Sequence, residues 1–200
     1  MANIISISRI FFVFIAAALL YFKNSSEAYL LAFALTVIAF ALDGLDGYVA
    51  RKFHEDSKLG SVLDIMGDRI AEYIYWIMLA HLGLVPVLFP IIAVTRGVVT
   101  DSLRSVAMEQ GLIAFGKGSM LQDPVCQWLC GAKPMKIGYA VVKAVAFALY
   151  ILACVPKMPE FTASCLLIVA AIAAEIAIIL CVLRGIPVIL ESRRFFKKED

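Results

Sequence analysis

Apolar residues fill long, nearly unbroken segments of this chain. A helix that crosses a bilayer needs about 20 mainly apolar residues. Six segments approach or reach that length, at residues 4–22, 29–51, 59–82, 85–107, 137–155 and 162–183. The pattern therefore predicts an all-α integral membrane protein with six transmembrane helices.

Short polar or proline-containing breaks separate these segments. They are "KNSSE" at 23–27, "HEDSK" at 54–58, Gly83 with Pro86, and "VPKMPE" at 155–160. Residues 110–134 are rich in glycine and predict a loop with one short surface helix. We expect a single six-helix domain at 1–186, followed by a basic cytoplasmic tail at 187–200.

The composition supports the membrane class. Hydrophobic residues make up 62% of the 200 residues and charged residues 17%, and the mean hydropathy is +0.92. Soluble domains average roughly 45–50% apolar and about 25% charged residues. The net charge of +2 is too small to indicate nucleic-acid binding. Because the first apolar segment lacks a small-residue cleavage site, we expect it to stay as a helix rather than be removed as a signal peptide.

Cations are unevenly distributed between the two sides of the predicted membrane. If both termini are cytoplasmic, only Lys23 and Lys157 fall clearly on the opposite side of the membrane. The cytoplasmic side then carries Lys52, Lys58, Lys117, Lys133, Lys136, Arg193, Arg194, Lys197 and Lys198. The positive-inside rule favours that arrangement. The tail "ESRRFFKKED" either lies on an anionic leaflet or is a solvated stop signal.

Four aspartates interrupt the second and third predicted helices. Asp43 and Asp46 are three residues apart near the end of the second helix, so they share a face. Gly60, Asp64 and Asp68 are spaced by four and form a stripe on the third helix. Because the break between the two helices is short, we expect antiparallel neighbours whose carboxylates face each other on the cytoplasmic side.

Four ionised carboxylates this close would repel one another and would be costly to desolvate. Two divalent cations would neutralise them, and Asp oxygens suit Mg²⁺, Mn²⁺ or Ca²⁺ rather than zinc. The five cysteines show no zinc-type spacing, and we expect free or buried thiols. The stretch thus predicts a metal-assisted phosphate site. The alternative is a set of interhelical salt bridges to Arg51, Lys52 and Arg69.

The motif resembles the signature of the CDP-alcohol phosphatidyltransferases. Its fixed positions read Asp43-x-x-Asp46-Gly47-x-x-Ala50-Arg51, then eight residues, then Gly60-x-x-x-Asp64-x-x-x-Asp68. The resemblance extends over most of the chain and implies a six-helix, homodimeric membrane enzyme. It implies transfer of the phosphatidyl group of CDP-diacylglycerol to an alcohol, with release of CMP.

The resemblance also implies roles for individual residues. Two Mg²⁺ (or Mn²⁺) ions would be held by Asp43, Asp46, Asp64 and Asp68. Asp68 would also be the general base that takes the proton of the acceptor hydroxyl. The CDP-lipid would be contacted by Asn3, Ser6, Gly47, Ala50, Arg51, Ser57 and Gly60. The match at Asn3 and Ser6 is looser, since Ala2 stands where the family has proline.

The acceptor has to be inferred from the later helices. Arg96 and Arg104 lie eight residues apart in the fourth helix, where an unpaired arginine is costly, and Lys136 and Lys143 lie in the fifth. Four cations near one cavity indicate an acceptor that carries a phosphate. The alternatives are that Arg96 pairs with an acid such as Glu72, and that Lys136 is an interfacial snorkelling lysine.

The arginine spacing resembles phosphatidylglycerophosphate synthases, which makes glycerol 3-phosphate the first expectation for the acceptor. Two residues depart from that subfamily, because Arg69 replaces the usual Lys and Gly97 the usual Glu. They leave a phosphatidylinositol phosphate synthase, using inositol 3-phosphate, as the alternative. Outside the enzyme class the rivals are a transporter, which usually shows inverted repeats, and a structural lipid-binding protein, which needs no paired aspartates.

Overall fold

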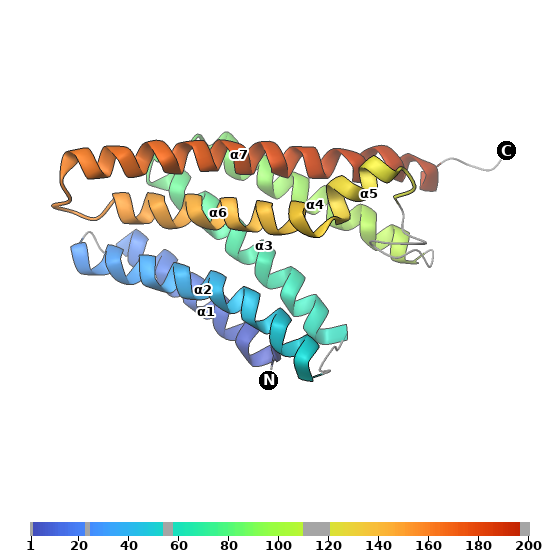
Figure 1. The fold of residues 1–200 in the computed structure, drawn as a ribbon, viewed down its shortest axis with the longest axis horizontal. Coiled ribbons are helices and arrows are strands. Elements are labelled where there is room, and N and C mark those ends of the chain that lie inside the picture. The colour runs from blue at the N-terminus through green and yellow to red at the C-terminus, as the bar shows by residue number, and fades with distance from the viewer. Residues whose placement is uncertain (1, 23–24, 54–57, 110–120, 197–200) are drawn as a thin grey trace. The chain divides into compact units, whose positions relative to one another are not determined.

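The computed structural model describes residues 2–22, 25–53, 58–109 and 121–196, and it describes their side chains except at 2–5, 45–53, 58–59, 61 and 195–196. This part of the chain is helical and contains no strand (Figure 1). Its elements are α1 (Ala2–Phe22), α2 (Ser26–Phe53), α3 (Lys58–His81), α4 (Leu88–Glu109), α5 (Pro124–Gly131), α6 (Lys133–Ala153), α7 (Glu160–Ser192) and the 3₁₀ helix η1 (Arg193–Phe196).

The all-α prediction is confirmed for the described residues. Each of the six predicted segments corresponds to one long helix, and α5 is a short helix inside the region predicted to be a loop. Helix α7 continues past the predicted end at 183 as far as Ser192, with Pro187 inside it. The helix therefore crosses the expected boundary between 186 and 187, and the division into a domain and a tail stays a prediction.

Three helical segments are long and apolar enough to cross a bilayer. They are Ser26–Gly44, Pro124–Ala153 and Glu160–Ser192, and the apolar segment Ser6–Phe22 is shorter. Helices α3 and α4 carry several charges within their length, which lowers their mean hydropathy. Large apolar side chains are also exposed along the helices, Phe11 at 64% and Phe161 at 81% among them. Such a surface fits lipid better than water, although the described residues do not establish the predicted number of six spans.

Local sequence signals explain where several helices begin and end. The Ser25 hydroxyl accepts the Ala28 N–H at 3.3 Å, and the Asp123 carboxylate accepts the N–H groups of Val125 and Cys126, so both residues cap a helix N-terminus. Helix α3 ends at His81, and Gly83 follows with a φ of 72°, which suits glycine. The bonds Gly83 N–H to Ala80 and Leu84 N–H to Leu79 close a Schellman motif there.

The chain divides into two compact units. The first contains residues 1–90 and 144–173, and the second contains 91–143 and 174–200. In the first unit α1 packs against both α2 and α3. The motif helices α2 and α3 therefore belong to one unit, and the four cations predicted for the acceptor belong to the other.

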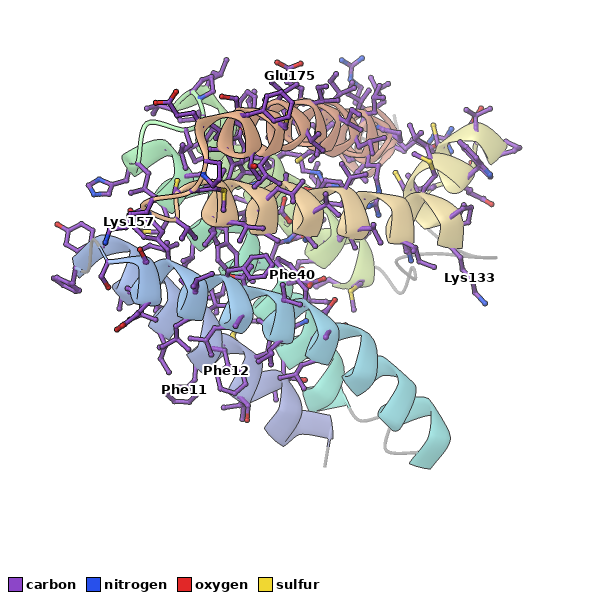
Figure 2. The ribbon with its side chains drawn as sticks, turned by 60° about the vertical axis from the view of Figure 1, so that its left-hand side comes forward. Phe11, Phe12, Phe40, Lys133, Lys157 and Glu175 are labelled. Carbon is purple, nitrogen blue, oxygen red and sulfur yellow. The ribbon has the colours of Figure 1, made fainter. Side chains whose placement is uncertain are left out.

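The core of the first unit is aromatic. The Phe147 ring of α6 lies 5.2 Å from Tyr75 and 4.8 Å from Trp76, both on α3, and Phe40 of α2 lies 5.8 Å from Tyr75. The Tyr75 hydroxyl is satisfied by Thr36 on α2, at 2.9 Å. Figure 2 shows Phe40 on the side of α2 that faces α6, whereas Phe11 projects outward from α1. These aromatic contacts hold α2 and α3 together within the unit that also contains the motif.

The second unit has a small core made of Ala107, Leu121, Cys130 and Val188. Beside it the buried Glu191 carboxylate of α7 accepts the backbone N–H groups of Gln122 and Asp123, at 2.6 and 3.1 Å. These bonds hold the start of α5 against the end of α7. All five cysteines are free, which agrees with the expectation of unpaired thiols.

Candidate active site

The described carboxylates of the motif lie on two neighbouring helices. Asp43 is in α2, and Asp64 and Asp68 are one turn apart in α3. Their exposure differs, since the side chain of Asp43 is 27% exposed and those of Asp64 and Asp68 are 55% and 49% exposed. Asp64 and Asp68 thus remain open to a ligand, while Asp43 is more enclosed.

All three carboxylates meet at one cation, Arg9 of α1. Arg9 is 2% exposed and its Nη1 atom contacts the Asp43 carboxylate. Nη1 also lies 3.5 Å from Asp68 Oδ1, and Nη2 lies 3.8 Å from Asp64 Oδ1. The aspartates were expected to face each other, and the structure places the three described ones against a guanidinium supplied by a third helix.

Arg9 was missed as a site residue by the sequence reasoning. The signal was present, because a single arginine inside an apolar helix is costly unless it has an anionic partner. The same criterion singled out Arg96. The salt-bridge alternative named Arg51, Lys52 and Arg69 as partners of the aspartates, and the structure adds Arg9 as a partner that it did not name.

Several other predicted site residues fall outside the described side chains. Helix α2 includes positions 46, 47, 50 and 51, but the side chains of Asp46, Ala50 and Arg51 are not described, and neither is that of Asn3. Ser57 lies outside the described residues. Ser6 is buried on α1, and Gly60 is half-buried on α3. Their roles toward the CDP-lipid stay predictions.

The described carboxylates fit a divalent cation by their chemistry, although they do not form a closed cage. Among the described residues, no three His, Cys, Asp or Glu side chains are arranged to hold a metal ion. The three aspartates nevertheless supply hard oxygen ligands on two helices, and the Arg9 guanidinium stands among them as a cation. The arrangement fits a metal that takes the place of this guanidinium.

A second cluster of charged residues occupies the other unit. Arg104 Nη1 lies 3.3 Å from Asp101 Oδ1, one turn away on α4. The aliphatic part of Arg96 packs against Gly185 of α7, where a Cβ atom would lie 2.8 Å from Arg96 Cγ. Within the part of the chain that is described, the buried Arg96 Nε finds no hydrogen-bond acceptor. Arg96 therefore has a donor to offer to an anion.

The two lysines predicted for this cluster lie on α6. Lys143 is buried and its Nζ lies 5.2 Å from the centre of the Tyr139 ring. Lys136 is half-buried and lies within electrostatic range of Arg104. The structure thus brings Arg104 and Lys136 near each other. Glu72, the alternative partner named for Arg96, lies 3.9 Å from Arg69 on its own helix.

Arg184 of α7 is a further cation that the sequence reasoning missed. It is 9% exposed, its guanidinium lies 5.2 Å from the Tyr139 ring centre, and it acts electrostatically on Lys136. Its position inside the long apolar run of α7 was again the available signal. The second unit therefore collects Arg96, Arg104, Lys136, Lys143 and Arg184, which we call the basic cluster.

Comparison with known proteins identifies the family of this chain. The family model described as CDP-alcohol phosphatidyltransferase matches residues 1–183. The chain belongs to the CDP-alcohol phosphatidyltransferase family, which confirms the resemblance seen in the motif.

One curated relative is an archaetidylinositol phosphate synthase from Aeropyrum pernix. It is 38% identical over 96 residues, which is 48% of this chain and 47% of the relative. The match thus spans about half the length of each protein.

Proposed function

We propose that this protein transfers the phosphatidyl group of CDP-diacylglycerol to the hydroxyl of a phosphorylated small alcohol and releases CMP. The observation that carries the proposal is the convergence of Asp43, Asp64 and Asp68 on one cation, within a chain whose family transfers groups from CDP-alcohols. Three acidic side chains from two helices meet where a divalent cation would be needed to bind a diphosphate.

Asp43, Asp46, Asp64 and Asp68 would hold two Mg²⁺ (or Mn²⁺) ions, which when bound would neutralise the donor diphosphate and make CMP a better leaving group. Asp68 takes the proton from the acceptor hydroxyl. The hydroxyl oxygen forms a bond to the lipid-side phosphorus, and the bond from that phosphorus to the bridging oxygen breaks, so that CMP leaves with the electron pair. The half-exposed carboxylate of Asp68 is accessible to an incoming alcohol.

The basic cluster supports an acceptor with its own phosphate. Buried arginines and lysines are costly without anions, and arginine binds phosphate oxygens through a planar fork. Asp101 pairs with Arg104 on α4, while Arg96 Nε has no acceptor in the described chain. A phosphate dianion could interact with several cations of the cluster together.

Two phosphorylated alcohols are candidates. The spacing of Arg96 and Arg104 supports glycerol 3-phosphate, which would give phosphatidylglycerophosphate. Inositol 3-phosphate is supported by Arg69 and by the relative, which is named an archaetidylinositol phosphate synthase, and Gly97 counts against the glycerol 3-phosphate subfamily. The name of the relative also contains the word archaetidyl. The assay described next therefore tests CDP-archaeol as a donor as well as CDP-diacylglycerol.

The experiment is a CMP-release assay on the purified protein in lipid–detergent micelles. Each donor is offered with glycerol 3-phosphate, inositol 3-phosphate, serine, free inositol or phosphatidylglycerol, with and without Mg²⁺. We expect Mg²⁺-dependent release with a phosphorylated alcohol and none from Asp68→Asn. Preference for serine, free inositol or phosphatidylglycerol would contradict the proposal that the basic cluster binds the phosphate of the acceptor. The assignment of the protein as a transferase would not be affected.

The membrane arrangement is part of the same proposal. The lysine and arginine distribution supports an N-in, C-in protein with its active site at the cytoplasmic side, and the family resemblance supports a homodimer. Labelling of single cysteines placed at either terminus, in sealed vesicles, tests the orientation. Cross-linking in native membranes tests the dimer.

A further inference from the structure

Arg9 is held on α3 by more than charge. Its Nη2 donates a hydrogen bond to the backbone carbonyl oxygen of Asp64 at 3.2 Å. Gly67 lies directly under the guanidinium, and a Cβ atom at that position would collide with Nη2. Because glycine has no side chain, the Nη2 end of the guanidinium can approach the backbone of α3 between Asp64 and Asp68.

Among the four described side chains of this arrangement the charges do not cancel. Asp43, Asp64 and Asp68 carry three negative charges when ionised, and Arg9 carries one positive charge. The guanidinium reduces the repulsion among the carboxylates but leaves the group negative. A site of this kind remains attractive to a divalent cation.

Arg9 and a metal ion cannot use these carboxylates in the same way. Mg²⁺ requires ligand oxygens at about 2.0–2.1 Å in octahedral geometry. The guanidinium instead separates the carboxylates, with Nη atoms 3.5 and 3.8 Å from Asp68 and Asp64. For the oxygens to close around an ion, the guanidinium must move away from them.

We propose that Arg9 is the resident counter-cation of the carboxylate site, which holds Asp43, Asp64 and Asp68 together in the metal-free protein and is displaced when a divalent metal binds. This inference rests on the proposed function for the metal, and it assigns to Arg9 a positioning role. Removing Arg9 should weaken the metal-free protein and strengthen metal binding, because the competing cation is gone while the ligands remain.

The test uses the full-length protein in detergent micelles after removal of metal with EDTA. Thermal unfolding is measured without metal, and Mn²⁺ affinity is measured by electron paramagnetic resonance. We expect Arg9→Gln to lower the unfolding midpoint of the metal-free protein and to tighten Mn²⁺ binding roughly ten-fold, since one nearby positive charge is lost. Arg193→Gln, which removes an exposed cation from η1, is the matched control and should change neither value.

Gly67→Ala provides a second variant that keeps the charge. The added Cβ pushes the guanidinium off α3, so Mn²⁺ binding should tighten in the same direction by a smaller factor. If Arg9→Gln does not fold, this variant decides the question. Unchanged or weaker Mn²⁺ binding in Arg9→Gln, or in Gly67→Ala when it stands alone, would overturn the inference.

The outcomes separate this inference from the proposed function. Suppose the wild-type protein binds Mn²⁺ and releases CMP, but the variants bind Mn²⁺ no more tightly. The inference about Arg9 is then wrong, and the proposed transferase activity is retained. Suppose instead that the variants bind Mn²⁺ more tightly, but the wild type releases no CMP from any donor and acceptor. The inference about Arg9 is then retained, and the proposed transferase activity is wrong. Absence of Mn²⁺ binding by every protein overturns the inference, and CMP release then reports separately on the transferase.

Discussion

Arg184 of α7 and Cys130 of α5 are joined by two reciprocal hydrogen bonds. Arg184 Nη2 donates to the Cys130 carbonyl oxygen at 3.3 Å, and Cys130 Sγ donates to the Arg184 carbonyl oxygen at 3.2 Å. Both residues are buried. The pair fixes the direction of the Arg184 guanidinium within the basic cluster, so that its remaining donors keep one orientation.

The orientation of Arg184 leads to a prediction about the acceptor. Arg184→Lys keeps the positive charge but loses the planar fork. Losing one charge-assisted hydrogen bond should cost about 2 kcal/mol, or roughly a 30-fold rise in the KM for the phosphorylated acceptor. The KM for the CDP-lipid should stay near that of the wild type. Steady-state kinetics with each substrate varied in turn measures both, and an equal rise in the two KM values would point to a general loss of structure.

Arg104 gives a related prediction from α4. Arg104→Ala removes a cation that lies 3.3 Å from Asp101, and it leaves that carboxylate without this partner. We expect kcat/KM for the acceptor to fall by roughly 30- to 1,000-fold, which corresponds to about 2–4 kcal/mol. Arg193→Ala is the control, because Arg193 is exposed on η1. Wild-type acceptor kinetics in Arg104→Ala would exclude Arg104 from the phosphate site.

The metal assignment predicts the behaviour of the carboxylate variants. Asp43→Asn, Asp46→Asn or Asp64→Asn should abolish CMP release and weaken its dependence on Mg²⁺, because each removes a charged oxygen ligand. Activity is measured over a Mg²⁺ titration. Near-normal turnover at low Mg²⁺ in any of the three would contradict that residue's role as a ligand.

Asp68 is predicted to act in the chemical step more than in donor binding. Asp68→Asn should retain affinity for the CDP-lipid while losing turnover, since an amide cannot accept the hydroxyl proton. Equilibrium binding of the labelled donor and CMP release are measured on the same preparation. Collapse of donor binding with a high residual rate would make Asp68 a ligand only.

The hydroxyl of Tyr75 offers a prediction about stability alone. It donates to Thr36 Oγ1 at 2.9 Å, and Thr36 in turn donates to the Ala32 carbonyl oxygen at 2.7 Å. Both hydroxyl-bearing residues are fully buried. Tyr75→Phe should lower the free energy of unfolding by about 1 kcal/mol without changing the catalytic constants. Denaturant titration in micelles measures the free energy of unfolding. A loss of activity at unchanged stability would show instead that this hydrogen bond is needed to position α2 and α3 at the active site.

The apolar pattern was sufficient to predict the helices and the class of the protein. Backbone N–H and C=O groups inside a bilayer must form hydrogen bonds within their own segment. A long apolar segment of this kind therefore forms a helix. Spacing of three and four residues likewise identified the carboxylate faces of α2 and α3, because side chains at those separations share one side of a helix. The family followed from the same residue types at the same intervals.

The partners of the charged residues were decided by tertiary packing. Arg9 is separated by 34 residues from Asp43 and by 59 from Asp68 in sequence, and only the packing of α1 against α2 and α3 brings their side chains together. Arg184 joins Tyr139 and Cys130 in the same manner. Helical periodicity reports the face of one helix and carries no information on which face of a distant helix lies opposite. The choice of partner depends on side-chain packing and on the cost of leaving a buried charge unpaired.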